Sequence, residues 1–389
     1  MEMIPYGRQN INQADIDAVV HVLQSDFLTQ GPVVRAFEKA VATYCVVQYG
    51  VAVNSATSAL HIACLALGVG KGDIVWTTPI TFVASANCAL YCGATVDFVD
   101  IDPKTYNLSV DCLKEKLARA EQANTLPKVV IPVHLCGQPC DMESIHDLSQ
   151  QYGFKIIEDA SHAIGGRYKD EPIGNCRFSD ITVFSFHPVK IITTGEGGMA
   201  LTNDKQLANR MRLLRSHGIT CDVAEMHPRS SEELWNYQQI ALGFNYRMTD
   251  IHAALGLSQM QRLDEFVTKR HDIAKRYDQL LLELPVVTPW QYPDSYSSYH
   301  LYVIRLKLGE INKTHRQVYD AFRMAGILVN LHYIPVYCQP YYEKQGFRAG
   351  YCPEAERYYS EVISIPMYIG LSDEKQDRVL VELRNVTGA

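Results

Sequence analysis

Short apolar runs alternate with amphipathic stretches through the first two hundred residues of the chain. The apolar runs are rich in Val, Ile and aromatic residues and predict strands, whereas the stretches between them carry apolar residues at helical spacing. The predicted strands are residues 49–53, 74–77, 95–99, 129–133, 155–158, 181–186 and 199–202, and the predicted helices are residues 57–67, 82–91, 110–120 and 142–152. This alternation predicts an α/β fold with a mostly parallel, doubly wound central sheet.

The pattern becomes mainly helical after residue 204. A helical segment at residues 250–282 is long enough to bridge two domains, and a proline-rich break follows it. The other predicted elements of this half are helices at 205–215 and 316–325, a strand-like run at 298–306 and a terminal helix from 373. We therefore predict an N-terminal arm and large domain at residues 1–254 and a smaller C-terminal α/β domain at residues 255–389.

Composition and charge narrow the class of protein. A chain of 389 residues with 47% hydrophobic and 20% charged residues has the balance of a globular enzyme that buries a large core. The formal net charge of −7 argues against nucleic acid or an anionic membrane as the main partner. The first residues do not resemble a signal peptide, and no apolar run is long enough to cross a bilayer, so we expect a cytoplasmic location.

Eleven cysteines suggest a disulfide framework until their positions are considered. Their number is odd and their spacing irregular, and Cys64, Cys88 and Cys92 lie in apolar helical patterns where a thiol acts as a small hydrophobe. Cys136 and Cys140 suggest a metal site, but no matching pair or nearby histidine cluster completes four ligands. We expect reduced structural cysteines and no metal site.

Lys190 lies in a glycine-rich loop between two predicted strands. Lysines are usually solvated surface residues, but Val189, Ile191 and Ile192 surround this one with apolar side chains. An amine in such surroundings loses part of its preference for the charged state and becomes a better nucleophile. The glycines that follow, residues 195–198, form either a simple tight turn or a close backbone approach to a ligand.

Asp159 ends the apolar strand that begins at Lys155. An Asp at this position can simply cap the next helix, yet Glu158 and Asp159 together put two carboxylates beside a buried run, and one should need a cationic partner. A loop lysine and a strand-end carboxylate are what pyridoxal phosphate (PLP) chemistry requires. The amine forms a Schiff base with the aldehyde, and the carboxylate keeps the ring nitrogen protonated. His162 is either a cofactor contact or a structural histidine.

Two further segments suit such a cofactor. At residues 54–61 a strand ends and a helix begins among hydroxyl and amide side chains, which serve either as ordinary helix caps or as a phosphate cradle. Ligands of open α/β sheets bind outside the carboxyl ends of strands, which favours the cradle. Phe82 follows another strand end, and it either packs in the core or stacks on the cofactor ring.

Taken together, five blocks resemble the DegT/DnrJ/EryC1/StrS family of sugar aminotransferases. The blocks are residues 54–61, the loop around Phe82, residues 158–162, residues 185–198 and residues 243–250. The resemblance extends from residues 4–8 to residues 330–335, nearly the whole chain. It implies the fold-type-I aminotransferase architecture and PLP as cofactor.

The resemblance also implies roles for individual residues. Lys190 corresponds to the Schiff-base lysine and Asp159 to the partner of the ring nitrogen. Asn245 corresponds to a residue that family dimers lend to the neighbouring subunit's phosphate, so a homodimer with shared active sites is expected. The other cofactor contacts implied are Thr57, Ser58 and Ser185 at the phosphate, Phe82 stacked on the ring and His162 near it. Ile191 departs from the family, whose members often have Asn after the lysine.

Through residues 5–9, 28–32 and 76–87, the N-terminal half most resembles those members that act in pseudaminic acid biosynthesis. That likeness implies transamination of a UDP-linked 4-keto-6-deoxy sugar with an N-acetyl group and the L-altrose configuration, with L-glutamate as donor. Tyr6, Arg8 and His332 are candidate contacts of the nucleotide sugar. Three alternatives remain: a transaminase for another nucleotide ketosugar, a PLP-dependent dehydratase, which Lys190 disfavours, and a non-catalytic regulator.

Overall fold

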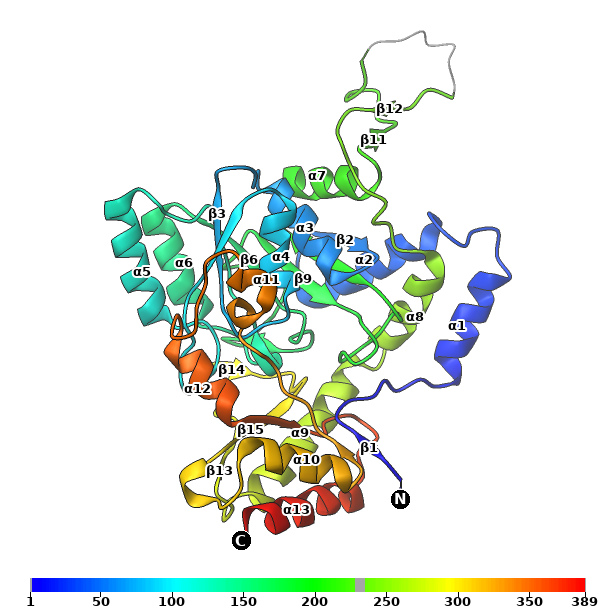
Figure 1. Cartoon of the computed structure of the whole chain (residues 1–389). Coiled ribbons are helices and arrows are strands. Elements are labelled where there is room, and N and C mark those ends of the chain that lie inside the picture. The colour runs from blue at the N-terminus through cyan, green and yellow to red at the C-terminus, as the bar shows by residue number, and fades with distance from the viewer. Residues whose placement is uncertain (1, 228–234, 389) are drawn as a thin grey trace.

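The computed structural model of the protein describes residues 2–227 and 235–388 (Figure 1). At its centre is a seven-stranded sheet in the order β2-β10-β9-β6-β5-β3-β4. These strands are β2 (Tyr49–Val53), β3 (Ile74–Thr77), β4 (Thr95–Phe98), β5 (Val129–Ile131), β6 (Lys155–Asp159), β9 (Ile181–Ser185) and β10 (Gly198–Thr202). Within this sheet β10 alone runs antiparallel to its two neighbours, so the sheet is mostly parallel, as predicted.

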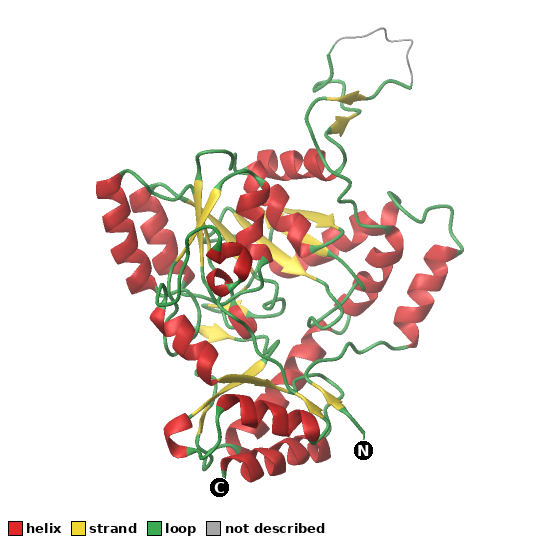
Figure 2. Ribbon diagram, viewed as in Figure 1, coloured by secondary structure: helices red, strands yellow, loops and turns green. Residues whose placement is uncertain are grey.

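Helices cover both faces of this sheet (Figure 2). One face carries α3 (Ala56–Ala66), α4 (Ala84–Tyr91) and α7 (Lys205–Arg215), and the other carries α2 (Pro32–Cys45), α5 (Val110–Ala123), α6 (Met142–Tyr152) and α8 (Asp250–Met260). Alternate side chains of one strand enter different cores: in β9, Val183 joins the first core and Phe184 the second. This explains why the strands read as continuous apolar runs.

The C-terminal half builds a smaller α/β unit, as the fold prediction expected. Helix α9 (Leu263–Leu280) leads into a sheet of β13 (Val286–Val287), β15 (Tyr302–Leu306) and β17 (Val362–Ile365). Helices α10 (His315–Met324) and α13 (Asp373–Thr387) pack in its core. The N-terminus joins this half, because β1 (Ile4–Pro5) pairs in parallel with β16 (Ile327–Leu328).

The connection between the two halves differs in detail from the prediction. The helix expected at residues 250–282 is two helices, α8 and α9, separated at Gln261 and Arg262. The proposed boundary after residue 254 falls inside α8. In addition, the segment with α11 (Pro340–Glu343) and α12 (Pro353–Glu361) returns to the large domain, where Tyr337, Tyr342 and Tyr358 join its first core. The division at 254 and 255 stays a prediction.

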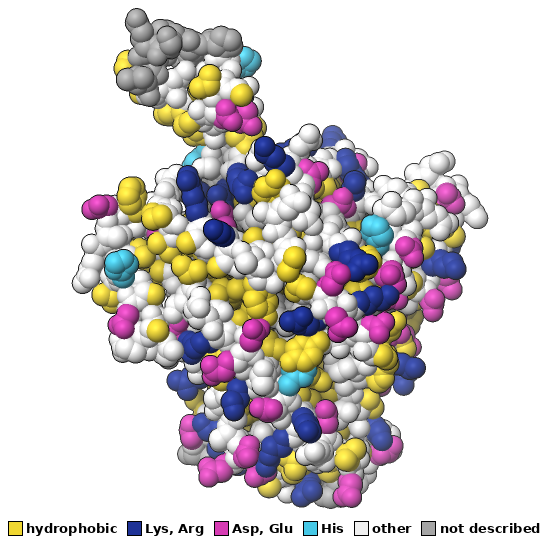
Figure 3. Space-filling view, turned by 180° about the vertical axis from the view of Figure 1, so that it is seen from behind, with side chains coloured by type: hydrophobic (Ala, Val, Ile, Leu, Met, Phe, Trp, Pro, Cys, Tyr) yellow, Lys and Arg dark blue, Asp and Glu magenta, His cyan; other side chains and the backbone are white. Residues whose placement is uncertain are grey.

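Two parts of the chain extend from the body. Helix α1 (Gln13–Leu23) lies at one side against α8, and an arm containing β11 (Ile219–Thr220) and β12 (Gln238–Gln239) projects away from the sheet (Figure 1). Hydrophobic side chains are visible along this arm from behind (Figure 3). A further three-stranded sheet joins β14 (Ser295–Tyr296), β7 (Arg167–Tyr168) and β8 (Glu171–Pro172). None of the described helices has both the length and the apolar character needed to span a membrane.

Candidate active site

Lys190 lies on the loop that joins β9 to β10. Its backbone N–H donates to the His187 carbonyl at 2.9 Å, which closes a turn, and the adjacent Ile191 and Ile192 are buried. Burial lowers the pKa of the Lys190 amine to about 8, against the opposing effect of the Asp159 charge. A substantial part of the amine is therefore neutral, and nucleophilic, near pH 8.

Asp159 is the last residue of β6 and is 5% exposed. One carboxylate oxygen accepts a hydrogen bond from the Ser85 hydroxyl at 2.6 Å, and the other accepts from the Ser161 N–H at 3.1 Å. Ser85 belongs to the first turn of α4 and Ser161 to the turn after β6. These two donors fix the carboxylate in orientation without neutralising its charge, which leaves it able to attract a cation.

Glu158, the other carboxylate of this strand end, has a different environment. Consecutive strand residues face opposite sides of a sheet, and Glu158 contacts His134 at 2.7 Å and accepts from the hydroxyls of Ser179 and Thr182. Burial acts to raise the pKa of Glu158, but these hydrogen bonds, His134 first, outweigh it and lower the pKa. Glu158 is therefore a structural carboxylate, and Asp159 is the one that faces the Lys190 loop.

The N-terminus of α3 lies beside Lys190 and Asp159. Ser55 caps the helix by accepting the N–H of Ser58 at 3.1 Å. Gly198 at the start of β10 approaches closely: a Cβ there would lie 2.5 Å from the backbone nitrogen of Ala56. Gly198 of the glycine-rich run therefore permits the contact between β10 and α3. Glu196 and Gly197 of the same run line a cavity that Lys190 also lines.

A cavity of about 550 Å³ collects most of the predicted site residues. Phe82 stands at its wall with 60% of its surface exposed, and Tyr6 and His332 come from the two ends of the chain with their ring centroids 5.3 Å apart. The predicted residues that line the cavity are Tyr6, Thr57, Phe82, Asp159, His162, Ser185, Lys190 and His332. Six segments that are distant in sequence thus meet at the carboxyl ends of the strands.

Three predicted residues do not line this cavity. The Ser58 hydroxyl donates to the Asn54 side chain at 2.7 Å and lies 7% exposed behind the helix start. Arg8 is exposed at the surface. Asn245 is on the segment that follows the projecting arm, where its backbone carbonyl accepts from Asn54 at 3.5 Å.

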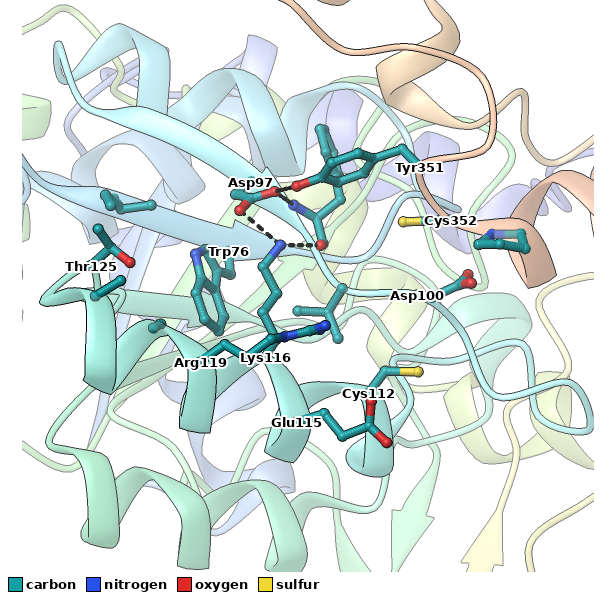
Figure 4. Close-up of a pocket in the computed structure, with 16 residues that line it drawn as sticks. Trp76, Asp97, Asp100, Cys112, Glu115, Lys116, Arg119, Thr125, Tyr351 and Cys352 are labelled. Carbon is teal, nitrogen blue, oxygen red and sulfur yellow. Dashed lines mark hydrogen bonds and ion pairs between the residues drawn. The ribbon is translucent and has the colours of Figure 1, made fainter.

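A second cavity, of about 560 Å³, lies at the edge strand β4 (Figure 4). Its lysine, Lys116, is already engaged: the amine contacts Asp97 at 2.7 Å and donates to the Phe98 carbonyl at 2.6 Å. It also lies over the rings of Trp76 and Tyr351. An amine held in this way is not free to bond a substrate, so Lys190 is the better candidate for a reactive lysine.

The comparisons with known proteins agree with this geometry. Residues 9–384 match the DegT/DnrJ/EryC1/StrS aminotransferase family. The chain belongs to this family. It is a PLP-dependent nucleotide-sugar aminotransferase.

Three proteins illustrate the similarity. The spore coat polysaccharide biosynthesis protein SpsC of Bacillus subtilis is 38% identical over 386 residues, covering 98% of this chain and 97% of its own. The UDP-4-amino-4,6-dideoxy-N-acetyl-beta-L-altrosamine transaminase of Campylobacter jejuni serotype O:2 is 37% identical over 376 residues. The match covers 96% of this chain and 95% of the transaminase. Helicobacter pylori PseC, an aminotransferase involved in the biosynthesis of pseudoaminic acid, superposes with a TM-score of 0.90 at 29% identity and covers both chains fully.

The cavity of this aminotransferase fits PLP, the cofactor with which a related sugar aminotransferase has been solved. Lys190 supplies a partly neutral amine and Asp159 a buried carboxylate. Among the described residues, the N–H groups of Ala56 and Thr57 have no protein acceptor, so they remain for a phosphate. When bound, PLP supplies an aldehyde that bonds amines and a ring that accepts electrons.

The structure gives His162 two neighbours, Tyr333 and His300, that were not among the predicted site residues. His162 accepts the Cys136 N–H at 3.3 Å through Nδ1, and its Nε2 contacts the Tyr333 hydroxyl at 3.2 Å. Both ring nitrogens of His162 thus have protein partners, and Tyr333 stands beside it on the cavity wall. His300 packs on His162 with ring centroids 4.4 Å apart, and its Nδ1 has no hydrogen-bond partner among the residues that the structure describes. A histidine inside the apolar run 298–306 was the available signal for His300.

Proposed function

We propose that this aminotransferase transfers the amino group of L-glutamate to C4 of a UDP-linked 4-keto-6-deoxy-N-acetyl hexose of L-altrose configuration, a step of pseudaminic acid biosynthesis. The single observation that carries the reaction class is the Lys190 amine and the Asp159 carboxylate facing one cavity beside a free helix N-terminus. The finer assignment is supported by the similarity to the Campylobacter transaminase and to PseC.

In this proposal Lys190 has two successive tasks. Its neutral amine first holds the cofactor covalently, and glutamate then displaces it. With PLP bound, the released amine would accept the proton from the glutamate Cα and deliver it to the carbon that was the aldehyde carbon of the cofactor, so that the amino group stays with the cofactor and water releases 2-oxoglutarate. With the ketosugar the same residue moves the proton in the reverse direction. Asp159, oriented by Ser85, keeps a proton on the ring nitrogen throughout.

The remaining contacts are proposed from position. Thr57 and Ser185 line the cavity and are proposed to contact the phosphate, and Ser58 would reach a phosphate by exchanging its bond to Asn54. Phe82 is proposed to stack on the ring, and His162 to pack near it. The proposed contacts of the nucleotide sugar are Tyr6, Arg8 and His332.

We propose that the enzyme works as a homodimer with shared active sites. Asn245 does not line the cavity of its own chain, and it follows an arm that projects from the body. A residue in that place is suited to reach the phosphate of a neighbouring subunit. Exposed apolar residues on the arm, among them Trp235 and Leu242, are suited to a partner surface.

The second candidate is an aminotransferase for a different nucleotide ketosugar. The specific observation in its favour is SpsC, a spore coat polysaccharide biosynthesis protein that is 38% identical to this chain, as is one altrosamine transaminase of Campylobacter jejuni. Both candidates use the same cofactor residues, because these contact the part of the reaction that all family members share. The two differ only in the ketone that receives the amine.

The deciding experiment is incubation of the enzyme with L-glutamate and a panel of UDP- and dTDP-linked 4-ketosugars, followed by identification of the amino sugars. The proposal expects the UDP-linked L-altrose-configured ketone to have the highest kcat/KM, and 2-oxoglutarate to form in equal amount. A dTDP-sugar, or a ketone of another configuration, with the highest kcat/KM would favour the second candidate.

The covalent role of Lys190 is tested separately with Lys190→Ala. Treatment with borohydride should fix the cofactor to the wild-type chain and not to the variant, as read by the mass of the intact protein. Cofactor retained covalently by the variant would contradict the assignment. Lys155→Ala, at an exposed lysine with a surface ion pair, serves as the matched control and should retain the link.

The shared site is tested by mixing two inactive variants, Lys190→Ala and Asn245→Ala. If Asn245 serves the neighbouring subunit, a mixed dimer contains one site with both native residues, and activity returns after subunit exchange. Mixtures that stay inactive while native mass spectrometry shows mixed dimers would contradict sharing.

A further inference from the structure

A hollow of about 540 Å³ at the edge of the central sheet is lined mainly by cations. It lies along β2, the end strand of the sheet, where α2 and α7 both pack against this strand. The cations are Arg35 and Lys39 of α2 and Arg212 and Arg215 of α7, and the one carboxylate is Glu38. Four cations and one carboxylate give the lining a formal charge of +3, in a chain whose net charge is −7.

The carboxylate of this hollow is already engaged at the strand edge. One oxygen of Glu38 accepts the N–H of Ala52 at 2.9 Å and a hydrogen bond from Arg215 at 2.5 Å. Arg215 also donates to the Ala52 carbonyl at 2.7 Å. Glu38 and Arg215 thus replace a neighbouring strand at Ala52, and Glu38 neutralises Arg215 alone.

The other three cations have no carboxylate partner among the residues that the structure describes. Arg212 donates only to neutral oxygens, the Gly50 carbonyl at 3.5 Å and the Asn209 side chain at 3.3 Å. Arg35 and Lys39 are exposed, four residues apart on one face of α2, and neither makes an ion pair or a side-chain hydrogen bond within residues 2–227 and 235–388. Like charges at this spacing destabilise a helix, and an anion bound between them would remove the repulsion.

The close approach of α2 to β2 brings these cations together. Gly50 lies at the floor of the hollow, and a Cβ there would be 3.1 Å from the Glu38 carbonyl oxygen, so the absence of a side chain permits the contact. The two helices belong to opposite faces of the sheet. Cations from both faces therefore meet at the uncovered edge of β2, where donors can approach an anion from two sides.

We propose that this hollow, the β2-edge site, binds a small molecule that carries a diphosphate group. Guanidinium groups match phosphate oxygens in pairs of hydrogen bonds, and a diphosphate has enough charge and oxygens to engage two helices at once. The volume is within the range of roughly 300–1,000 Å³ typical of small-molecule sites. A long polyanion would meet the negative charge of the rest of the chain. The β2-edge site and the PLP cavity share no lining residue.

Calorimetric titration of the PLP-loaded, assembled enzyme with inorganic pyrophosphate tests the proposal. Bound PLP fills the phosphate cradle at α3, so pyrophosphate cannot bind there. The wild type should bind pyrophosphate, more weakly as salt is raised. The double variant Arg35→Ala/Lys39→Ala should weaken binding roughly tenfold or more, because two charge-assisted contacts are lost. A wild type that does not bind, or a double variant that binds equally well, would overturn the proposal.

A matched control separates the site from general charge. Arg316→Ala/Lys344→Ala removes the same two charges at exposed positions outside the β2-edge site and should bind pyrophosphate as the wild type does. Equal weakening in both double variants would show that only net charge matters and would contradict a site. All four substituted side chains are exposed, so both proteins should fold, as circular dichroism would verify.

A further variant distinguishes the β2-edge site from the nucleotide-sugar site. Arg8→Ala removes a proposed contact of the nucleotide sugar and should leave pyrophosphate binding unchanged. Binding lost in Arg8→Ala and retained in Arg35→Ala/Lys39→Ala would assign pyrophosphate to the active site and overturn the proposal. The result does not depend on which ketosugar the enzyme aminates, so the proposed function can fail while the β2-edge site stands.

The chemical class of the ligand is tested with three other probes. UDP should compete with pyrophosphate, and inorganic phosphate should bind roughly tenfold or more weakly, because it engages fewer donors. Equal affinity for inorganic phosphate would contradict a diphosphate site. Vesicles of phosphatidylglycerol should not bind the enzyme. Vesicle binding that is lost in Arg35→Ala/Lys39→Ala, with none of pyrophosphate, would assign the cations to a membrane surface instead.

Discussion

At the scale of single residues, a chain of hydroxyls supports Asp159. The Thr81 hydroxyl contacts the Ser85 hydroxyl at 2.7 Å, and Ser85 donates to the carboxylate at 2.6 Å. Both hydroxyls are buried, at 3% and 0% exposure, so water cannot replace them. A carboxylate that must stay charged and correctly aimed in a buried place depends on such donors.

Ser85→Ala should therefore slow the reaction with glutamate without removing covalent cofactor attachment. The carboxylate loses a hydrogen bond to a charged group, a contribution of about 1.5–3 kcal/mol, which corresponds to roughly tenfold or more in rate. Single-turnover absorbance with glutamate measures this. Ser149→Ala is the matched control, since Ser149 is buried in α6 and donates only to the His146 carbonyl. Equal rates for the two variants would contradict the role of Ser85.

The lowered pKa of Lys190 predicts how cofactor uptake depends on pH. Only the neutral amine bonds the aldehyde, so uptake by cofactor-free enzyme should rise with pH and level off above a midpoint near 8. Asp159 holds the lysine pKa up, so Asp159→Asn should move the midpoint to lower pH. Stopped-flow absorbance over a pH series provides the measurement. A midpoint near the ordinary lysine value would show that Lys190 is not desolvated.

At the scale of elements, α2 depends on a carboxylate far away in sequence. Its N-cap, Gly31, has no side chain to cap the helix. Instead the buried Asp250 accepts the N–H groups of Gly31 at 2.6 Å, Val33 at 2.8 Å and Val34 at 3.0 Å. One side chain thus satisfies donors that a helix start leaves unpaired and fixes α2 to α8.

Asp250→Ala should lower the free energy of unfolding by about 2–3 kcal/mol, because buried donors of α2 lose their acceptor. Urea unfolding of the purified enzyme, followed by circular dichroism, measures the loss. Asp373→Ala provides the control: Asp373 lies in the first turn of α13 with its side chain 82% exposed and should cost a few tenths of a kcal/mol. Similar midpoints for both variants would contradict the capping role.

At the scale of the whole molecule, the surface carries apolar groups that a single subunit leaves exposed. Ile16, Val20 and Leu23 form one stripe on α1, with 48%, 42% and 55% of their surfaces exposed. Their spacing of four and three residues places them on a single helix face, apart from the side where Asp15 bonds Ser258 of α8. Such a stripe, together with the arm, is what a subunit interface would cover.

The proposed dimer therefore predicts a measurable effect of α1. The wild type should have twice the chain mass by sedimentation, and Leu23→Asp should shift the population toward the monomer, because a charge would then enter an apolar contact. Val381→Asp in α13, at a residue 54% exposed and away from α1, should leave the mass unchanged. A wild-type monomer, or equal behaviour of the two variants, would contradict the proposed interface.

The sequence by itself predicted most elements of the large domain and pointed to Lys190 and Asp159 as candidate site residues. Strand alternation and helical spacing depend on neighbours within one element, so β9, β10 and the helices of the large domain could be read from the chain. Lys190 was identifiable because its neighbours are apolar, and Asp159 because it ends a buried strand. The signal in each case lies within a few residues, where local propensity and burial act together.

Only the tertiary structure decided which residues meet. Nothing local to Ser85, Tyr333 or His300 shows that they surround Asp159 and His162, since these contacts join segments 74 to 171 positions apart. The pairing of β1 with β16, which brings Tyr6 to His332, is of the same kind. Contacts between distant segments are fixed by packing of the whole chain, because each local sequence is compatible with many partners until the core selects one.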